Sequence, residues 1–352
     1  METTPVDLGF LEPSEPWLLT NKFFRSKVGG KPAWLELLKL PKPDELLCEQ
    51  CKEPLTFLCQ VYAPVEENEA SFHRILYVFV CSTAACNQSP APETRTIKVL
   101  RSQLPRRNEF YEYDPPDETN ESPPVKSPVP LCVVCGCRGP KLCSRCKSVN
   151  YCGPSHQRLD WKGGHKTVCS EEGTVERTLQ REPSSILLPE FEIITEPEEY
   201  EAKAKVSEEE NEKRQMEEYE RLKNEGKVGA LDDLPEGELD KYSGEQVEDK
   251  TFNRFKARIA VDPDQVLRYE RRGNPLWLSP VVPKEIPSCG MCAGPRAFEF
   301  QIMPQLLNSL ASDSLDWGTL VCYTCEGSCN IEGYVDEFIY RQDVLNLNIT
   351  KP

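Results

Sequence analysis

Cysteine and histidine side chains are concentrated in one short segment, residues 132–169. Eight of them follow the spacing C-x2-C-x7-C-x2-C-x5-C-x3-H-x8-H-x3-C. Thiolate and imidazole groups bind Zn2+ in sets of four around a tetrahedral ion. Eight such ligands therefore predict two interleaved zinc sites. The alternative, a disordered Cys-rich linker, offers no reason for this spacing.

A second source of cysteine pairs is a pattern that the chain repeats. The stretches CEQCKEPLTFLCQ (48–60) and CGMCAGPRAFEFQ (289–301) keep Cys, Cys, Pro, Phe and Gln at the same offsets. Related apolar runs that reach a Cys follow both stretches, at 76–87 and 320–330. Order and approximate spacing are kept, so the pattern predicts an internal duplication.

The duplication predicts one metal site in each of two units, at about 17–105 and 251–348. Each unit supplies C-x2-C and later C-x3-C or C-x4-C. Two such pairs form a closed all-thiolate site, which indicates a structural zinc ion rather than a catalytic one. The alternative is eight buried thiols without metal. The predicted ligands are Cys48, Cys51, Cys81 and Cys86 in unit one, and Cys289, Cys292, Cys325 and Cys329 in unit two.

Two further cysteines and one histidine are interpreted as non-ligands. Cys59 and Cys322 have no partner at the matching offset, so we expect them to be buried as small apolar residues. His73 is the only histidine outside the segment 132–169 and is expected on a strand surface. The chain shows no Gly-rich phosphate loop and no nucleophile elbow. We therefore expect no catalytic residues, and a protein that is not an enzyme.

The charge of the chain is strongly negative and unevenly spread. The 352 residues carry a net charge of −16, which disfavours nucleic acid as a partner. Residues 171–250 hold 26 acidic and 11 basic residues, whereas residues 132–169 hold seven basic residues and one acidic residue. The basic segment either balances the zinc thiolates, docks on the acidic segment or, least expected, binds nucleic acid. No apolar run suits a membrane, and no basic leader starts the chain, so we expect a soluble intracellular protein.

The expected fold is mainly β, of the α+β class, with two zinc-pinned β-rich units that pack together into one larger sheet or barrel. FLCQVYA and LYVFV read as strands of unit one. A further strand near 186–194 is expected to join the sheet of one unit. The predicted domains are an N-terminal unit at 1–110, a Pro-rich linker at 111–131, a zinc finger at 132–169, an acidic linker at 170–250 and a C-terminal unit at 251–352.

The linkers are expected to lack a core of their own. Residues 114–130 are rich in Pro and Ser and should be extended or disordered. Residues 198–227 carry i,i+4 pairs of opposite charge but no wide apolar stripe. They are interpreted as a solvated, partly helical linker, or else as an acidic surface for a basic partner.

The segment 132–169 resembles a MYND zinc finger, with Tyr151 and Trp161 also matching that family. The resemblance implies that successive ligand pairs along the chain bind the two ions in alternation. Cys137 would then lie beside the first ion without binding it. MYND fingers bind proteins, often short Pro-containing peptides, and are not enzymes. The implied ligand sets are Cys132, Cys135, Cys152 and His156 on one Zn2+, and Cys143, Cys146, His165 and Cys169 on the other.

The duplicated units, the finger between them and the motif LPEFEII (188–194) together resemble the programmed cell death protein 2 family over almost the whole chain. Cys322 departs from that pattern, since an aliphatic residue is expected there. The resemblance implies a chaperone for a newly made, basic protein of the small ribosomal subunit, universal small-subunit protein five. It further implies support of 40S assembly between cytoplasm and nucleus, and a link to proliferation and apoptosis.

The alternative is an adaptor in transcription, cell proliferation or apoptosis that works through the peptide groove of the finger. Deleting residues 132–169 separates the two hypotheses, because the adaptor needs the finger for all binding. The chaperone can retain its client if the duplicated units hold it, which is the arrangement we favour.

Overall fold

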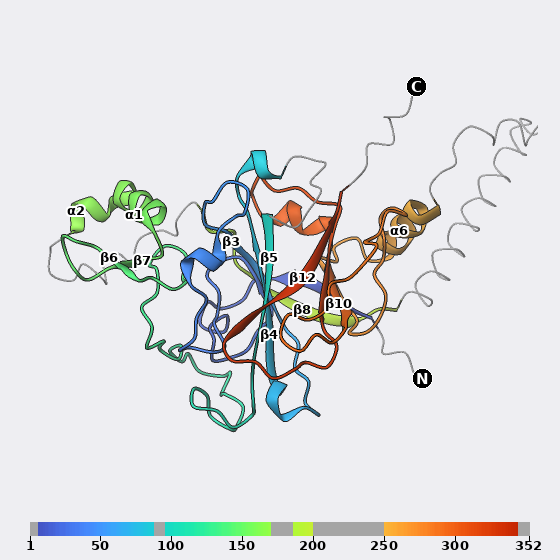
Figure 1. Ribbon diagram of the computed structural model, residues 1–352, viewed down its shortest axis with the longest axis horizontal. Helices are drawn as coiled ribbons and strands as arrows, with labels where there is room; N and C mark the ends of the chain where they lie inside the picture. The colour runs from blue at the N-terminus through green and yellow to red at the C-terminus, as the bar shows by residue number, and fades with distance from the viewer. Residues whose placement is uncertain (1–5, 88–95, 170–185, 200–249, 344–352) are drawn as a thin grey trace, which may run out of the picture.

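The computed structural model describes residues 6–87, 96–169, 186–199 and 250–343. It is mostly β-structure with short helices, and a small lobe around residues 132–169 sits at one side (Figure 1). The predicted fold class is confirmed. The strands are β1 Asp7–Glu12, β2 Lys27–Val28, β3 Thr56–Tyr62, β4 His73–Val80, β5 Ile97–Leu104, β6 Lys141–Leu142, β7 Asn150–Tyr151, β8 Phe191–Pro197, β9 Leu267–Tyr269, β10 Arg296–Ile302, β11 Thr319–Cys325 and β12 Tyr334–Gln342.

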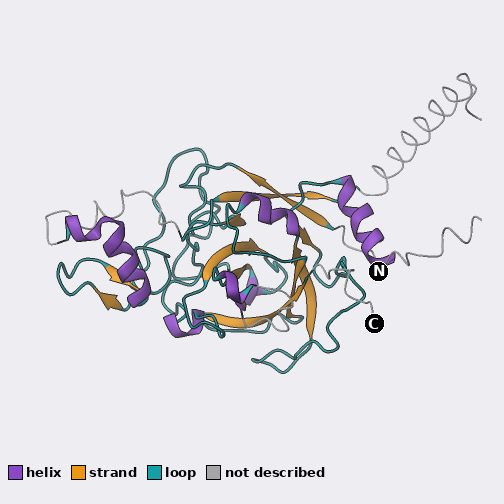
Figure 2. Cartoon of the chain, turned by 90° about the horizontal axis from the view of Figure 1, so that it is seen from above, coloured by secondary structure: helices purple, strands orange, loops and turns teal. Residues whose placement is uncertain are grey.

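Ten of these strands form one closed antiparallel barrel in the order β1-β8-β2-β3-β4-β5-β12-β11-β10-β9, which closes from β9 back to β1 (Figure 2). Strands β3–β4–β5 come from unit one and β10–β11–β12 from unit two. Both sets carry a bulge at the same place, after Phe57 and after Phe298. The units meet where β5 pairs with β12, so the hypothesis of one shared barrel is confirmed.

The strand expected near 186–194 is β8, and it joins the sheet between β1 and β2. It begins at Phe191, later than expected. The residues just before it do not pair as a strand but bind the turn after β2, where Gly30 N donates to Leu188 O at 2.9 Å. Gly29 has a φ of +69°, and a Cβ there would lie 1.9 Å from Pro189 O. Only glycine lets β2 approach this segment so closely.

Alternation along each strand separates an inner core from two outer ones. On β4, Leu76, Val78 and Val80 join the cluster inside the barrel, which also contains Phe300 and Ile339 from unit two. Their neighbours Ile75, Tyr77 and Phe79 belong to an outer cluster. All eight residues of β4 are buried, because the chain covers this strand on both faces.

Two ion pairs between the units are fully buried. Arg74 on β4 donates to both carboxylate oxygens of Glu299 on β10, at 2.5 and 2.7 Å. Arg101 Nε on β5 donates to Glu337 Oε1 on β12 at 2.6 Å. All four side chains have an exposed fraction of 0%. Burial alone would raise the pKa of Glu299, but the Arg74 charge and hydrogen bonds outweigh burial and lower it.

The helices are short, and η6 contributes Leu306 to the core cluster inside the barrel. None that the structure describes is long and apolar enough to cross a membrane. Helix α6 packs Phe255 against Leu276, Leu278 and Met303. The helical segments are η1 Pro43–Leu46, η2 Glu69–Ser71, η3 Ala84–Cys86, α1 Pro154–Asp160, η5 Trp161–His165, α2 Lys166–Val168, α6 Lys250–Val261 and η6 Pro304–Ser309.

The Pro-rich linker is irregular but anchored to the barrel. Asn21 exchanges two hydrogen bonds of 3.0 Å with the backbone of Val125. Ser127 Oγ donates to Leu37 O at 3.1 Å. Residues 114–130 are thus irregular, with bends, and are held against unit one by these hydrogen bonds. Almost all of the acidic segment 198–227, with its predicted i,i+4 pairs, lies outside the described residues.

The prediction that His73 lies on a strand surface is wrong. It begins β4 but is buried, stacked on Phe24 with ring centroids 4.3 Å apart. Its Nδ1 lies 3.1 Å from the Tyr62 hydroxyl. Burial, helped by the charge of Arg106, lowers the pKa of His73 to about 4. The surrounding rings come from segments distant in sequence, which a strand pattern does not reveal.

Replacing Glu299 by Ala should strongly destabilise the protein, because it leaves Arg74 buried without its partner. The expected loss in free energy of unfolding is about 3–5 kcal/mol. Urea denaturation of the full chain measures it. Glu332→Ala, which breaks the exposed pair with Lys39, is the matched control and should cost far less. Equal losses for the two variants would contradict this assignment.

His73 should make the fold sensitive to mild acid. The pKa of a histidine is about 6.5 in an unfolded chain. Below that pH the unfolded state binds a proton that the folded state does not bind until pH falls to about 4. Stability should therefore decline from about pH 6.5 towards 4, by about 2 kcal/mol between pH 7 and pH 5 through this group. His73→Gln should flatten that slope in denaturation curves at pH 7 and pH 5, and an unchanged slope would refute it.

Candidate functional site

The segment 132–169 forms a small lobe in which a two-stranded hairpin, β6–β7, faces helix α1 and the η5–α2 turn. The hairpin and the helices bring the predicted ligands together. The ring of Tyr151 lies 6.2 Å from that of His165, and Trp161 lies 5.9 Å from it. Tyr151 also donates to Asp160 Oδ2 at 2.7 Å. The two aromatic residues thus wall the second predicted metal site.

The structure gathers the eight finger residues into the two quartets that the resemblance implied. Within each quartet the ligand atoms lie within 4.8 Å of one another. In the first, Cys135 Sγ is 3.9 Å from Cys152 Sγ. In the second, Cys143 Sγ is 3.8 Å from Cys169 Sγ. Cys137 is buried beside the first quartet and points to Cys135 O, at 3.9 Å, rather than into it.

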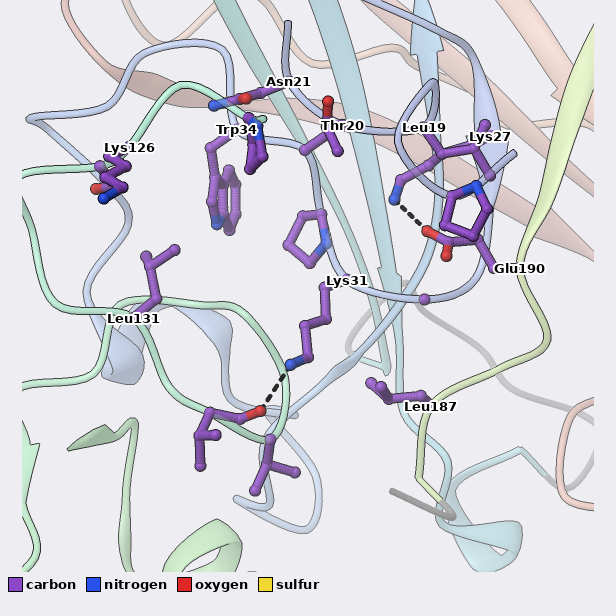
Figure 3. Close-up of a pocket in the computed structure, with 18 of the residues that line it drawn as sticks. Leu19, Thr20, Asn21, Lys27, Lys31, Trp34, Lys126, Leu131, Leu187 and Glu190 are labelled. Atoms are coloured by element: carbon purple, nitrogen blue, oxygen red, sulfur yellow. Dashed lines mark hydrogen bonds and ion pairs between the residues drawn. The ribbon is translucent and has the colours of Figure 1, made fainter. Parts of the chain in front are cut away.

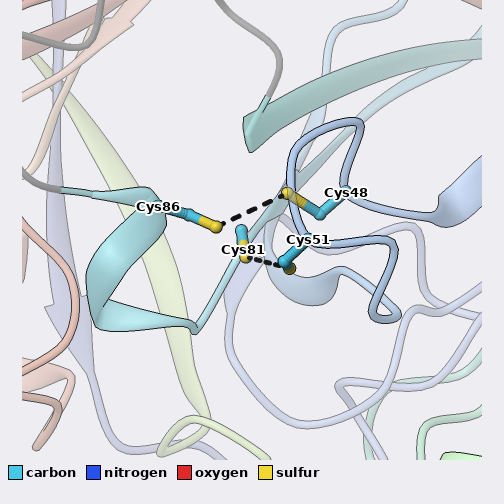
Figure 4. Close-up of side chains that lie close together, drawn as sticks. All are labelled: Cys48, Cys51, Cys81 and Cys86. Atoms are coloured by element: carbon cyan, nitrogen blue, oxygen red, sulfur yellow. Dashed lines mark hydrogen bonds between the residues drawn. The ribbon is translucent and has the colours of Figure 1, made fainter.

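The two repeat units each gather one all-cysteine quartet. In unit one the four thiols converge between the turn after η1 and the end of β4 (Figure 4). Cys48 Sγ lies 4.0 Å from Cys86 Sγ, and Cys51 Sγ lies 3.6 Å from Cys81 Sγ. In unit two the matching distances are 3.8 Å for Cys289 and Cys329 and 3.6 Å for Cys292 and Cys325.

These distances suit zinc. A tetrahedral ion with metal–sulfur distances of about 2.3 Å separates its sulfur ligands by about 3.8 Å. Disulfide sulfurs lie only about 2.05 Å apart. All seventeen cysteines are free. The finger and the clusters therefore support zinc binding, with no quartet leaving a position for substrate.

The backbone gives independent support. The residue after each C-x2-C pair has a positive φ: 62° at Lys52, 73° at Gly136, 54° at Lys147 and 56° at Ala293. In each case its N–H donates to the carbonyl of the first cysteine at 2.9 Å. Three of these residues are not glycine, so the chain tolerates local strain to aim both sulfurs at one point. Four identical turns in four sites fit a common metal-binding function.

The finger docks on unit one through the repeated Trp motif. Trp34 Nε1 donates to Gly136 O at 2.8 Å, and Lys31 Nζ donates to Val133 O at 2.7 Å. On the other side of the first quartet, Ser155 Oγ donates to Glu53 Oε2 at 2.8 Å. Barrel and finger also share one continuous apolar cluster. The finger is therefore built into unit one rather than tethered beside it.

A groove with a volume of about 1230 Å³ runs between the finger and unit one (Figure 3). Trp34 and Leu37 of the barrel, Leu131 of the linker and Leu159 of the finger form much of its apolar wall. Several prolines also line it, namely Pro16, Pro32, Pro124, Pro130 and Pro189. Such a surface suits an extended peptide.

Lys27 and Lys31 are two of the polar residues that line the groove. Lys27 Nζ lies 2.5 Å from Glu190 Oε1, and Lys31 reaches across to Val133 O (Figure 3). Burial lowers the pKa of both lysines, although Glu190 opposes this at Lys27 and the nearby thiols Cys135 and Cys132 oppose it at Lys31. The lining also contains Lys126 and the carboxylates of Asp160 and Glu190, so groups of both charges line the groove.

The repeated Gln has a role that spacing alone did not reveal. Ala33 N donates to Gln60 Oε1 at 2.9 Å, and Leu276 N donates to Gln301 Oε1 at 2.6 Å. In both units the amide fixes the residue before the repeated Trp. The sequence did indicate that this Gln matters, because it recurs at the same offset in both repeats. Cys59 and Cys322 are buried inside the barrel as expected, and burial raises the pKa of both thiols.

Comparison with known proteins agrees with this architecture. The profile of the programmed cell death protein 2 N-terminal domain matches residues 5–118, that of its C-terminal domain matches residues 249–343, and that of the MYND finger matches residues 132–169. No solved structure matches the chain. The protein is thus a single β-barrel built from two duplicated zinc-binding units, with a MYND finger inserted between them.

Its relatives identify the family. The chain is 43% identical to programmed cell death protein 2 of Rattus norvegicus over 96% of each chain, and 30% identical to programmed cell death protein 2-like of Mus musculus over 90% of each. It is 25% identical to the Schizosaccharomyces pombe protein named "Probable 20S rRNA accumulation protein 4", over 86% of this chain and 87% of that one. The chain belongs to the programmed cell death protein 2 family.

Two cysteines of β11 provide a matched test of the metal sites. Native mass spectrometry of the full chain should find four zinc ions, one for each quartet. Cys325→Ser should lose one ion, because a ligand is removed. Cys322→Ser should keep all four and only lose about 1–3 kcal/mol of stability, since a hydroxyl is buried in the core. Loss of an ion from the Cys322 variant alone would contradict the assignment.

Proposed function

We propose that this protein is a chaperone that binds a newly made, basic protein of the small ribosomal subunit and supports assembly of the 40S subunit. The observation that carries the proposal is the relative named for 20S rRNA accumulation, which aligns with 86% of this chain. The family resemblance implies universal small-subunit protein five as the client. As a carrier between synthesis and assembly, the protein would work in cytoplasm and nucleus.

Charge and site chemistry support a binding role. Free ribosomal proteins are strongly basic, and a chain with a net charge of −16 attracts them over distance. The four quartets have full ligand sets, so they hold shape rather than perform chemistry. The one histidine outside the finger, His73, is buried among aromatic rings. We therefore assign no catalytic residue and propose that the protein is not an enzyme.

A second candidate is an adaptor that acts through the finger in transcription, cell proliferation or apoptosis. The groove favours it, because finger residues Val133, Val134 and Leu159 form one wall and proline-rich segments form the other. A Pro-containing peptide would find an apolar floor and lysine donors there. In the chaperone hypothesis the barrel units carry the client and this groove is accessory.

Co-expression with the proposed client distinguishes the two. The chaperone hypothesis predicts a soluble one-to-one complex, with zinc retained, in pulldown and native mass spectrometry. Leu131→Glu adds a charge in the groove, whereas Leu142→Glu adds one at another exposed site, in the finger and outside the groove. Both variants should still capture the client. An insoluble client beside a folded, zinc-loaded protein would refute the chaperone and favour the adaptor, for which only Leu131→Glu should abolish peptide binding.

A further inference from the structure

The duplication allows the outer faces of the two units to be compared residue by residue. In unit one the outer aromatic cluster is fully covered: Trp34 has an exposed fraction of 2%, and Tyr77 and Phe79 have 0%. Part of the cover is the chain that follows β5. It returns over the cluster, where Tyr111 Oη donates to Trp34 O at 3.0 Å and to Leu35 O at 2.8 Å.

The matching face of unit two is less completely covered. Phe298, Val321 and Tyr323 are buried beneath a layer of half-buried aromatic side chains. Val281 and Val282 beside them have exposed fractions of 56% and 42%. No segment among the described residues buries this layer. We define the unit-two outer face as Trp277, Val281, Val282, Phe338 and Tyr340.

The duplication indicates which segment could cover this face. The register of the strands makes Arg101 of β5 equivalent to Arg341 of β12, since each pairs with the matching leucine of the middle strand. The chain after β12 therefore corresponds to the chain that covers unit one after β5. Tyr111 contacts the unit-one cluster ten residues after Arg101, and eleven residues follow Arg341. Judged by unit one, the segment after Arg341 is therefore long enough to reach the matching face of unit two.

The end of β12 already touches the face. Gln342 Nε2 donates to Val281 O at 2.7 Å, and Tyr340 Oη lies 3.5 Å from the same oxygen. Trp277 and Tyr340 meet edge to face, with centroids 6.0 Å apart. A chain that leaves Asp343 therefore starts beside Val281.

The segment that follows, VLNLNITKP, has the composition of a cover. Leu345, Leu347 and Ile349 alternate with polar residues. In an extended chain this period of two places the three aliphatic side chains on one side. We propose that residues 344–352 bind in cis across the unit-two outer face, with Leu345, Leu347 and Ile349 against Trp277 and Tyr340. This inference does not depend on the proposed function.

Hydroxyl-radical footprinting of the full, zinc-loaded chain tests the proposal. Ending the chain after Asp343, or replacing Leu347 by Asp, should raise the modification rates of Trp277 and Tyr340 severalfold. Asn348→Asp adds the same charge on the polar side of the segment and should leave both rates unchanged. Tyr113, an exposed residue of the Pro-rich linker, serves as the internal reference in every sample.

Three outcomes would overturn the proposal. The first is equal modification of Trp277 and Tyr340 in the full and shortened chains, with zinc content unchanged. The second is protection that grows with protein concentration and survives the shortening, which would assign the face to a second copy. The third is protection that appears only when the basic ribosomal client is added, which would assign the face to the client.

Discussion

Closure of the barrel across the two halves of the chain is the constraint on which the rest of the structure depends. Neither unit has a complete sheet, and the inner core is assembled from both, with Val78 of unit one in the same cluster as Cys322 and Ile339 of unit two. The buried pairs Arg74–Glu299 and Arg101–Glu337 join at this boundary. A buried charge without its partner is strongly destabilising. Arrangements in which the units separate or shift in register would leave these charges unpaired and are therefore disfavoured.

The metal quartets and the barrel support each other. In each repeat unit the quartet joins the turn before one long strand to the end of the next strand, as Cys48 and Cys81 do around β3 and β4. Arg101, which closes the barrel with Glu337, also donates to Cys329 O at 3.1 Å. Metal binding in unit two and strand pairing with unit one therefore share a residue, and loss of either weakens the other.

The features that recur in sequence were the ones that sequence could predict. Repetition marked the eight cysteines of the units, the shared strands and the Gln, while spacing marked the finger. The buried partners Arg74 and Glu299 carry no such signal, because they occur once and lie on strands of different units. His73 was misplaced for the same reason: its cover by Phe24 and Tyr111 comes from segments far along the chain. Strand β1 lacks a repeat and became visible only through its pairing with β8 and β9.

The inserted finger breaks the symmetry of the duplication, and this asymmetry bears on function. The finger and its linker follow unit one and are fastened to it through Trp34, whereas the equivalent Trp277 of unit two stacks only partly covered against Tyr340. One half of the barrel therefore presents a groove shaped with the finger, and the other presents an apolar face of its own. The two halves of one barrel therefore differ on their outer surfaces, because the finger is fastened to unit one and unit two has no equivalent insertion among the described residues.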